Sequence, residues 1–319
     1  MAFTHIPVLC EECMQGLNIK PDGIYLDGTF GRGGHSRVLL SRLGAQGRLI
    51  AMDRDSAAVE AAAAIDDPRF SIYHRNFSAL KSLCEELGLI GRIDGILLDI
   101  GISSPQIDDA QRGFSFEKDG PLDMRMDQSA ALDAAAIVNT YDEDKLAYIF
   151  KTYGEERFAR RAARAIVERR KEQPFTRTLE LANLLKAAIP GAPGPKHKAT
   201  RCFQALRIAV NSELYELQAA LDGALQVLAP GGRLCVISFH SLEDRIVKQF
   251  YKEYSSLPDF VKNLPLTQDE LMARYGDKVL LKVVGKAQKA SAEEVARNVR
   301  SRSAVLRTAE RMGGAYGTE

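Results

Sequence analysis

The sequence predicts an α/β protein with a doubly wound, Rossmann-like parallel sheet that is interrupted by an inserted helical domain. Short apolar strands alternate with helices between residues 24 and 100, and the alternation resumes after residue 211. Between these two parts the strand pattern disappears and helical patterns take its place. Apolar strands that alternate with helices are typical of a parallel sheet with both faces covered. The interruption therefore indicates one sheet domain made from two separated parts of the chain.

Seven strands are expected, four before the interruption and three after it. They are Ile24–Asp27, Arg48–Asp53, Phe70–Tyr73, Ile96–Ile100, Leu234–Phe239, Leu280–Val284 and Ser303–Arg307. A helical pattern at Val38–Leu43 follows the glycine-rich turn after the first strand. Helices are also expected at Ala57–Ile65 and at Leu214–Leu228, where leucines recur on one stripe. Pro230-Gly-Gly232 is expected to turn the chain into the fifth strand.

The interrupting stretch is expected to be helical and basic. Glu155–Glu172 predicts one helix and Leu179–Ile189 a second, which the proline-rich run Pro190–Pro195 ends. Such a stretch can form a domain of its own. The expected domains are residues 1–106 with 211–319 as the sheet domain, and residues 107–210 as the inserted helical, basic domain.

Composition indicates a globular protein of the cytoplasm. Of the 319 residues, 45% are hydrophobic and 27% are charged, and no run reaches the roughly 20 apolar residues that cross a bilayer. The amino-terminal residues lack a secretion signal, so the five scattered cysteines are expected to be free thiols. Cys10 and Cys13 could form half of a zinc site, but no second pair appears. We therefore expect no metal.

Charge is distributed unevenly although the net charge is only +1. Residues 101–150 hold ten acidic and four basic residues, whereas residues 151–210 hold fourteen basic and five acidic residues, a local balance of +9. Such a balance is typical of a surface that binds a polyanion. A solvated helical face would explain it equally well.

Arginines in this stretch are spaced so that one helix would present them together. On a helix that begins near Glu155, residues three and four apart share a face. The residues expected to contact RNA phosphates are Arg157, Arg160, Arg161, Arg164, Lys196, Lys198 and Arg201. Contacts of this kind position RNA without reading its sequence.

Acidic residues end the first, second and fourth predicted strands. Ligands bind beyond the carboxyl ends of strands in open α/β sheets, so Asp27, Asp53 and Asp99 mark a candidate site. The turn Gly28–His35 supplies glycines for close backbone approach to a ligand. Ser36 occupies the third glycine position of a dinucleotide fingerprint. An aminoacyl-adenosyl ligand, whose ribose hydroxyls suit Asp53, fits better than a dinucleotide.

Eight motifs occur in a fixed order along the chain. They are D-G-T-F-G-R-G-G-H at 27–35, D-R-D at 53–55, L-L-D-I-G-I-S-S-P-Q at 97–106, G-F-S-F at 113–116, G-P-L-D-M-R-M at 120–126, Y-G-E-E-R at 153–157, T-R-C-F-Q-A-L-R-I at 200–208 and S-F-H-S-L-E-D-R at 238–245. Together they resemble the bacterial ribosomal RNA small subunit methyltransferase H family, also called MraW. The resemblance covers nearly the whole chain.

The resemblance implies a class I methyltransferase with a helical insertion and S-adenosylmethionine as its cofactor. It implies methylation of the N4 of a cytidine in the decoding centre of 16S small-subunit ribosomal RNA, in naked RNA or in the assembled subunit. Carried over position by position, the cofactor contacts fall on Gly33, Gly34, His35, Asp53, Phe77, Asp99 and Gln106. A homodimer is left open. Asn298–Ser303 departs from the family pattern because Val299 replaces a proline.

The chemistry of an exocyclic amine suggests the catalytic candidates. Its lone pair is delocalised into the ring, so acceptors aimed at the amine hydrogens help it to attack a methyl group. Asp99, Ser103 and Ser104 are the candidates, although the two serines could simply shape a turn. His240 could line the substrate pocket or hydrogen-bond Glu243 or Asp244 at the start of the next helix. Without the resemblance, His35 would be a helix-start residue satisfied by backbone.

Two rival functions remain at this point. An NAD-dependent oxidoreductase would need a third glycine in the turn and a hydride-transfer site. A non-catalytic RNA-binding assembly factor would need no cofactor. Stoichiometric binding of S-adenosylmethionine would exclude the second.

Overall fold

The computed structural model describes most of the chain and divides it into two compact units. The described residues are 7–192, 197–261 and 264–313. One unit consists of Met1–Gly101 with Leu214–Glu319, and the other consists of Ile102–Glu213.

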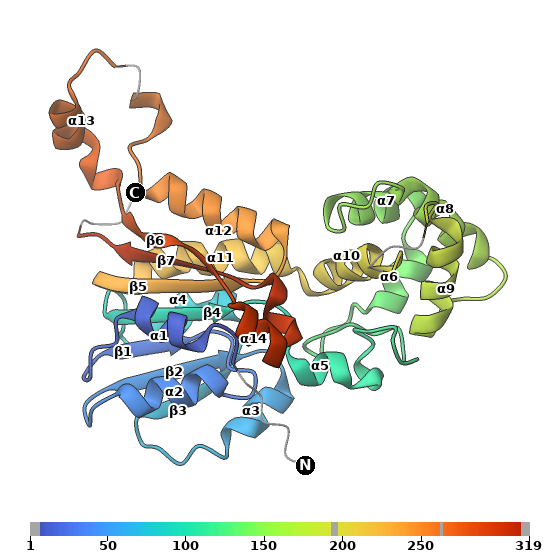
Figure 1. Ribbon diagram of the computed structural model, residues 1–319, viewed down its shortest axis with the longest axis horizontal. Coiled ribbons are helices and arrows are strands. Elements are labelled where there is room, and N and C mark those ends of the chain that lie inside the picture. The colour runs from blue at the N-terminus through green and yellow to red at the C-terminus, as the bar shows by residue number, and fades with distance from the viewer. Residues whose placement is uncertain (1–6, 193–196, 262–263, 314–319) are drawn as a thin grey trace. The chain divides into compact units, whose positions relative to one another are not determined.

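A seven-stranded sheet forms the centre of the first unit (Figure 1). Its strands are β1 (Ile24–Asp27), β2 (Arg48–Asp53), β3 (Phe70–His74), β4 (Ile93–Asp99), β5 (Leu228–Ser238), β6 (Leu281–Lys289) and β7 (Val305–Arg311). The strand order is β3-β2-β1-β4-β5-β7-β6. Strands β1 to β5 pair in parallel, whereas β7 runs antiparallel to β5 and β6. The predicted Rossmann-like α/β fold class is confirmed.

Helices cover both faces of this sheet. The helices of this unit are α1 (Cys10–Leu17), α2 (Gly34–Arg42), α3 (Ser56–Ala62), α4 (Leu80–Glu86), α11 (Glu213–Val227), α12 (Ser241–Tyr254), α13 (Gln268–Tyr275) and α14 (Ala292–Arg297), with 3₁₀ turns η1 (Phe77–Ala79), η3 (Asp259–Val261), η4 (Gly276–Lys278) and η5 (Val299–Ser303). Of these, α13 packs in a separate small cluster with Leu257 and Val261. Alternate strand residues face opposite sides. Leu26 packs with α4, α11 and α12, whereas Tyr25 packs with α1 and α2. Both faces are therefore apolar, as a parallel sheet requires.

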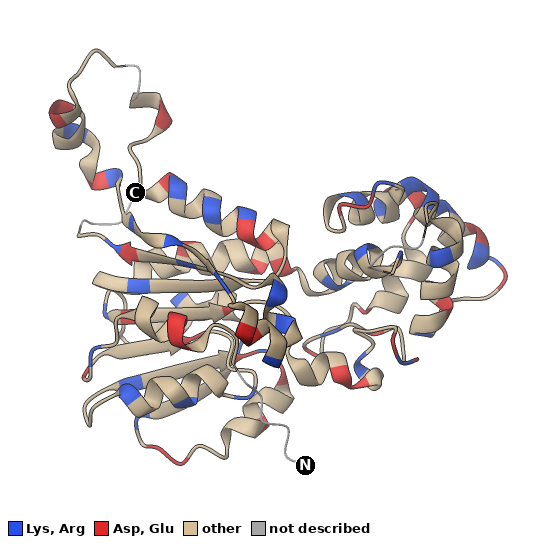
Figure 2. Cartoon of the chain, viewed as in Figure 1, with Lys and Arg blue, Asp and Glu red and all other residues tan. Residues whose placement is uncertain are grey.

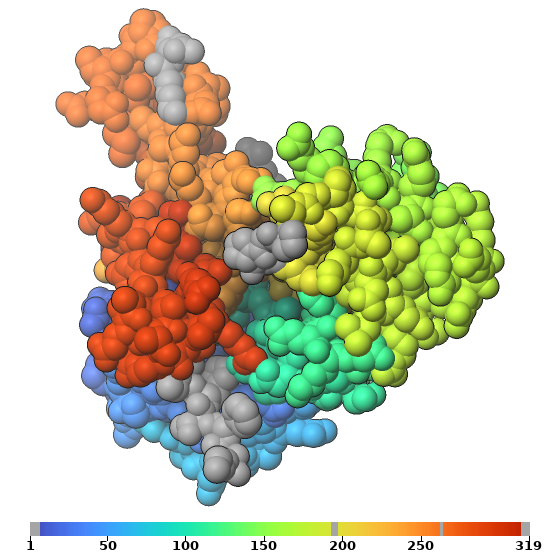
Figure 3. Space-filling view, turned by 45° about the vertical axis from the view of Figure 1, so that its right-hand side comes forward, coloured from blue at the N-terminus to red at the C-terminus, as the bar shows by residue number. Residues whose placement is uncertain are grey.

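Residues from the two ends of the sequence meet within this unit. The backbone N–H of Leu9, just before α1, donates to the Glu294 carboxylate on α14 at 2.8 Å. Figure 3 shows the blue amino-terminal and red carboxyl-terminal segments side by side. Val299 is the first residue of η5. Asn298 precedes it, and the Asn298 side chain accepts a hydrogen bond from the Arg300 N–H. A proline is tolerated at such a first position, so Val299 preserves the local turn.

The second unit is helical and has its own core. Its elements are α5 (Ser104–Asp108), η2 (Ala110–Arg112), α6 (Ala134–Thr140), α7 (Glu143–Thr152), α8 (Ala159–Arg169), α9 (Thr178–Ala188) and α10 (Thr200–Asn211). Phe150, Ile166, Leu185 and Leu206 are buried together in this core. Each of these side chains comes from a different helix, so the core ties α7, α8, α9 and α10 into one body.

The single helix expected from Glu155 to Glu172 is present but shorter, since α8 spans Ala159–Arg169. α8 begins only at Ala159, because Glu155 has a φ of 49° and cannot continue a right-handed helix. A Cβ on the preceding Gly154 would lie 2.6 Å from the Arg201 carbonyl oxygen, so α10 approaches the chain closely here. This close approach lies in the non-helical turn between α7 and α8. Among the described residues, no helix is long and apolar enough to cross a membrane.

Candidate functional site

Three aspartates lie at one end of the sheet. Asp27, Asp53 and Asp99 are the last residues of β1, β2 and β4, which are neighbours in the order β2-β1-β4. These strands are parallel, so their carboxyl ends meet at the same edge. Ligand sites of open α/β sheets occupy this edge. The geometry therefore brings together the three carboxylates that the sequence singled out.

Asp27 is buried and holds the glycine-rich turn. One of its carboxylate oxygens accepts from the Ser36 hydroxyl at 2.7 Å and the other from the Thr29 N–H at 3.0 Å. Burial raises the pKa of Asp27, which these hydrogen bonds partly offset. The sequence had not indicated any role for Thr29 or Ser36. Their letters stand beside the aspartate in the first motif, but only the folded turn shows which atoms they contact.

Asp53 holds the same turn from the neighbouring strand. Its two carboxylate oxygens accept from the N–H groups of Gly31 at 2.7 Å and Asp55 at 2.9 Å. Burial raises the pKa of Asp53. Gly33 has a φ of 75°, and a Cβ there would lie 2.7 Å from the Phe30 ring, so only glycine fits. Gly34 then begins α2.

Asp99 carries a buried carboxylate oxygen, Oδ1, with no hydrogen-bond partner among the described residues. Its backbone N–H donates to the Thr29 hydroxyl at 2.7 Å. Burial raises the pKa of Asp99 to about 6; the nearby His35 opposes this shift and the charge of Asp27 adds to it. A buried polar atom without a partner costs free energy unless a ligand satisfies it. Asp99 is therefore the acceptor most open to a ligand.

His35 lies in the first turn of α2, buried beside Asp99. Its Nε2 lies 2.9 Å from the Val8 carbonyl oxygen, which can only accept, so Nε2 carries a proton. Nδ1 then faces an Asp99 oxygen at 3.6 Å. A proton on either of these two groups makes the contact favourable. His35 therefore makes the backbone contact predicted for a helix-start histidine and also lies at the strand ends beside Asp99.

Phe77 follows β3 in η1 and packs against the glycine-rich turn. A Cβ on Gly28 would lie 3.0 Å from the Phe77 Cβ. The ring is only partly buried. Phe77 therefore belongs to the same end of the sheet as the three aspartates.

These residues fit the cofactor expected from the sequence. S-adenosylmethionine carries cationic groups, a carboxylate and two ribose hydroxyls. The unpartnered oxygen of Asp99 suits a cation or an N–H donor, and the carboxylate of Asp53 suits hydroxyl donors. The turn around Gly33 leaves backbone without Cβ atoms at the strand ends. No redox or metal chemistry is required of these side chains.

Gln106, Ser103 and Ser104 lie in the helical unit at the start of α5. Ser103 is the residue before the helix, and its N–H donates to the Gln106 side-chain oxygen at 3.0 Å. Gln106 is buried and forms a capping box with Ser103. This geometry matches the alternative in which the serines shape a turn. Any contact of these residues with cofactor or substrate stays a proposal.

His240 caps α12. Its Nδ1 accepts from the Glu243 N–H at 3.4 Å, and its Nε2 lies 3.1 Å from a Glu243 carboxylate oxygen. The side chain is 11% exposed. The structure therefore places His240 in the capping arrangement that sequence offered as the alternative to a substrate contact.

The four arginines of the helical unit are all exposed, but they do not share one helix. Arg157 precedes α8 and lies over the Phe158 ring, so its expected place on the helix is wrong. Arg160 and Arg164 pair with Asp144 and Glu143 on α7 at 3.2 and 3.4 Å. Figure 2 shows the basic positions gathered on α8 and around its start.

A cavity of about 580 Å³ lies at the start of α8 within the helical unit. Its lining includes Lys151, Arg157, Arg160 and Arg161, against two glutamates. The basic side of this unit is therefore hollowed as well as charged. A hollow of this kind can receive a phosphate group.

The remaining basic candidates have structural partners or lie outside the described residues. The Lys198 ammonium donates to the Ile189 carbonyl at the end of α9 at 2.9 Å. Arg201 donates to the Glu155 carbonyl at 3.1 Å. Lys196 lies outside the described residues. The Lys198 and Arg201 side chains each keep further N–H groups that could donate to a phosphate.

Cys10 and Cys13 lie on α1. Cys13 is buried, and burial raises the pKa of Cys10 to about 11. Both thiols are therefore protonated at neutral pH. No group of potential metal ligands in residues 7–192, 197–261 and 264–313 includes either cysteine.

The comparisons identify the family. A model described as the MraW methylase family matches residues 2–312. A Clostridium thermocellum structure, provisionally assigned as an rRNA-methylase, aligns over 97% of this chain and 100% of its own, with 11% identity and a TM-score of 0.44. A Streptococcus mutans structure, provisionally assigned as a methyltransferase and crystallised with SAH, aligns over 97% and 100%, with 12% identity and a TM-score of 0.40. The functional conclusion rests on the family match alone.

Proposed function

Because this chain belongs to the MraW methylase family, we propose that it methylates the N4 amine of a cytidine in the decoding centre of small-subunit ribosomal RNA. Family membership makes the chain an S-adenosylmethionine-dependent methyltransferase of ribosomal RNA. The base, the atom and the site in the RNA are what we propose beyond it. Work on an RNA of this kind would place the protein in the bacterial cytoplasm.

The observation that supports an amine as the target is the unpartnered Oδ1 of Asp99. S-adenosylmethionine, when bound, supplies an electrophilic methyl group. Asp99 accepts an N–H of the amine, which stabilises the positive charge that develops on nitrogen as its lone pair localises. With its pKa near 6, Asp99 is mostly ionised at pH 7 and ready to accept.

The other strand-end residues position the cofactor and Asp99 and do not contact the amine that receives the methyl group. Asp53 accepts ribose hydroxyls in addition to the Gly31 N–H. Asp27 and Thr29 hold the turn, and Thr29 also fixes the backbone of Asp99. His35 sets the charge environment of Asp99. Orientation of two reactants by such groups contributes much of the rate in a displacement reaction.

The helical unit contributes RNA affinity in this proposal. Exposed arginines around the cavity at the start of α8 bind phosphates. Lys198 and Arg201 extend this surface, and His240, Ser103 and Ser104 remain candidates near the base. Such contacts position the RNA, and the residues at the strand ends select the base.

The test is transfer of labelled methyl from S-adenosylmethionine to small subunits and to naked small-subunit RNA, followed by nucleoside analysis. We expect N4-methylcytidine at one position with the parent and none with Asp99→Asn. An Asp67→Asn variant serves as control, because Asp67 lies in a surface turn paired with Arg69. Methylation of a ring carbon, a ribose or another base would contradict the proposal.

A further inference from the structure

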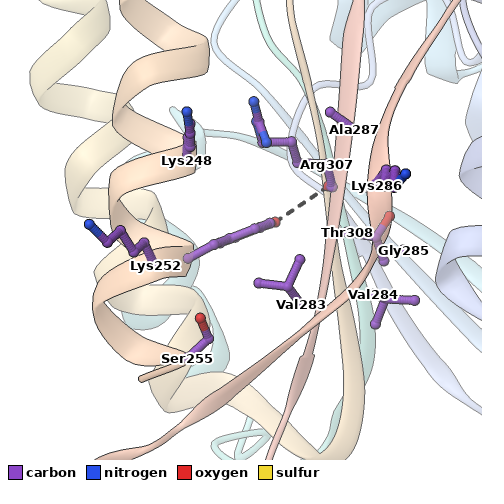
Figure 4. Close-up of a pocket in the computed structure, with 11 residues that line it drawn as sticks. Lys248, Lys252, Ser255, Val283, Val284, Gly285, Lys286, Ala287, Arg307 and Thr308 are labelled. Atoms are coloured by element: carbon purple, nitrogen blue, oxygen red, sulfur yellow. Dashed lines mark hydrogen bonds between the residues drawn. The ribbon is translucent and has the colours of Figure 1, made fainter. Parts of the chain in front are cut away.

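A second basic pocket lies in the sheet unit, between α12 and the strands β6 and β7. It has a volume of about 260 Å³. Figure 4 shows Lys248 on α12 and Arg307 on β7 on either side of the space, with Val283 of β6 pointing toward the helix. Lys286 lines it from β6. None of these residues belongs to the strand-end site described above.

An irregularity in the edge strand creates this pocket. Val284 pairs with Thr308 and Gln288 with Leu306, so the three residues 285–287 stand opposite Arg307 alone. Gly285 within this bulge has a φ of 67°. Bulges bend a strand and redirect its side chains, and they are frequent near functional sites. On the opposite wall, Lys248 and Lys252 lie four residues apart and share one face of α12.

The pocket carries excess positive charge. Arg307 forms a two-pronged ion pair with Asp244 of α12, at 2.8 and 3.0 Å, so these two charges offset each other. Lys248, Lys252 and Lys286 are exposed, and the ion pairs found among the described residues involve none of them. No acidic side chain lines the cavity. The lysine charges of the lining are therefore not offset by acidic lining residues, and in Figure 4 the Lys252 ammonium points away from the strands.

The floor is apolar and rigid. Val283 is 46% exposed on the edge strand β6. Tyr251 is buried and its hydroxyl donates to the Leu234 carbonyl at 2.9 Å, which fixes the ring. An apolar floor with cationic walls matches a sugar-phosphate unit, whose ribose is partly apolar and whose phosphate is anionic. Phosphate contacts dominate the affinity of proteins for nucleic acids.

The bulge of β6 lies toward the same end of the sheet as Asp99. Asp99 of β4 aligns with Ile237, Leu306 and Gln288 on successive strands β5, β7 and β6. Three strand spacings of about 4.8 Å separate β6 from β4 by roughly 14 Å. This spacing runs across the strands only, so RNA bound at the strand ends would contact the pocket through a nucleotide other than the target.

We propose that the α12–β6 pocket binds a backbone phosphate of the RNA substrate, on the sheet unit itself and in addition to the helical unit. This inference rests on the proposed function, because it needs an RNA substrate. It predicts that RNA affinity is shared between two surfaces, one on each unit.

The experiment compares two charge-matched double variants of the full chain. K248Q/K286Q removes one lysine from each wall of the pocket. K81Q/K278Q removes two lysines of the same unit that do not line it. The dissociation constant for transcribed small-subunit RNA is measured from low to high salt. We expect the slope of log affinity against log salt to fall by about 1.4 to 1.8 in K248Q/K286Q, at 0.7 to 0.9 per lost phosphate contact.

Further measurements separate the outcomes. The control variant should keep the parent slope, K248R/K286R should restore it, and the affinity for S-adenosylmethionine should be unchanged in all variants. An unchanged slope in K248Q/K286Q, or an equal loss in the control, overturns the pocket proposal. Inorganic phosphate that binds the parent but not K248Q/K286Q, with an unchanged RNA slope, assigns the pocket to a free anion and also overturns it.

Failure of the proposed function gives a different result. If the parent forms N4-methylcytidine and the pocket variant keeps its salt slope, only the pocket proposal falls. If the parent methylates no cytidine N4 yet the slope falls as expected, the pocket stands and the proposed reaction falls. If the parent binds no RNA, both fall.

Discussion

At the scale of single residues, the strand-end site combines two aspartates whose oxygens all accept hydrogen bonds within the protein with a third that keeps one oxygen unpartnered among the described residues. Asp27 accepts from Thr29 and Ser36, and Asp53 accepts from Gly31 and Asp55. Asp99 keeps a buried oxygen without a partner and has a pKa of about 6. A protein tolerates such an arrangement mainly where function requires it, because burial of an ionised group lowers stability. Stability and function therefore oppose each other at this one side chain.

Replacing Asp99 with Asn should raise stability and abolish turnover. The pKa of Asp99 in the folded protein, about 6, lies above its ordinary value of 3.8. Above pH 6 the Asp99 carboxylate is ionised in the folded and the unfolded protein, and burial of its charge lowers the free energy of unfolding by the largest amount. As pH falls from 6 toward 4 the folded state gains a proton and this destabilisation disappears. Without cofactor, we expect the variant's free energy of unfolding to exceed the parent's by about 1–3 kcal/mol at pH 8.

Urea unfolding at pH 4.5 and pH 8 measures this difference, which should shrink at the lower pH. Methyl transfer at pH 8 by the same variant should be lost. A variant that is less stable than the parent at pH 8 would show that Asp99 supports the fold through a contact that the ionised group makes.

Replacing Asp53 with Ala should weaken binding of S-adenosylmethionine by about 1.5 to 3 kcal/mol, the loss of charge-assisted hydrogen bonds to ribose hydroxyls. Calorimetric titration measures the dissociation constant. Because Asp53 also accepts from the Gly31 N–H, thermal unfolding must confirm a folded variant. Asp67→Ala, at a surface turn, is the control. An unchanged dissociation constant in folded protein would remove the ribose assignment.

At the scale of elements, the apolar patterns predicted where the strands lie and where β1 and β2 end, whereas β6 and β7 end at Lys289 and Arg311, beyond the expected Val284 and Arg307. Asp53 and Asp99 could be found this way because an apolar run stops at each of them. The direction of β7 could not, since an apolar run has the same pattern in parallel and antiparallel strands. The approach of α10 to Gly154, in the turn before α8, is a tertiary contact that no local pattern contains. The contacts of Ser36 likewise depend on how the turn folds back on Asp27.

The basic surface at α8 offers a test with a built-in control. Arg157 and Arg161 line the cavity and have no ion pair among those found in the described residues, whereas Arg160 and Arg164 pair with α7. We expect R157Q/R161Q to lower the salt slope of RNA binding by about 1.4 to 1.8. We expect R160Q/R164Q to lower it less, because acidic partners already offset these two charges.

Cofactor affinity should stay at the parent value in both variants, since the substitutions leave the sheet unit intact. The measurement is the dissociation constant for small-subunit RNA over a series of salt concentrations. Equal slopes in parent and R157Q/R161Q would show that α8 is a solvated face, the alternative that charge composition alone left open.

At the scale of the whole molecule, the chain contains separate cores in its two units. Leu26 and Leu221 are buried in the sheet unit, and Phe150 and Leu206 in the helical unit. The residues that fit S-adenosylmethionine through described contacts lie in the sheet unit. Ligand binding stabilises the body that binds it. The two units should therefore respond differently to the cofactor.

Scanning calorimetry should resolve this response. At a cofactor concentration one hundred times the dissociation constant, the sheet unit gains about 2.7 kcal/mol. We expect the transition of the sheet unit to move to higher temperature, and that of the helical unit to move little. Asp53→Ala at the same cofactor concentration should show a smaller shift. A single transition that moves as a whole would mean that the two cores unfold together.

The pairing of β4 with β5 has a consequence for how the protein is made. These strands are neighbours in the sheet, yet all of the helical unit lies between them in the sequence. A ribosome synthesising this chain releases the helical unit while β4 still presents an open edge. Unpaired edges promote aggregation, and pairing between strands distant in sequence is slow. During synthesis the sheet is therefore incomplete until β5 emerges from the ribosome. The cell must keep the exposed edge of β4 from aggregating during that time.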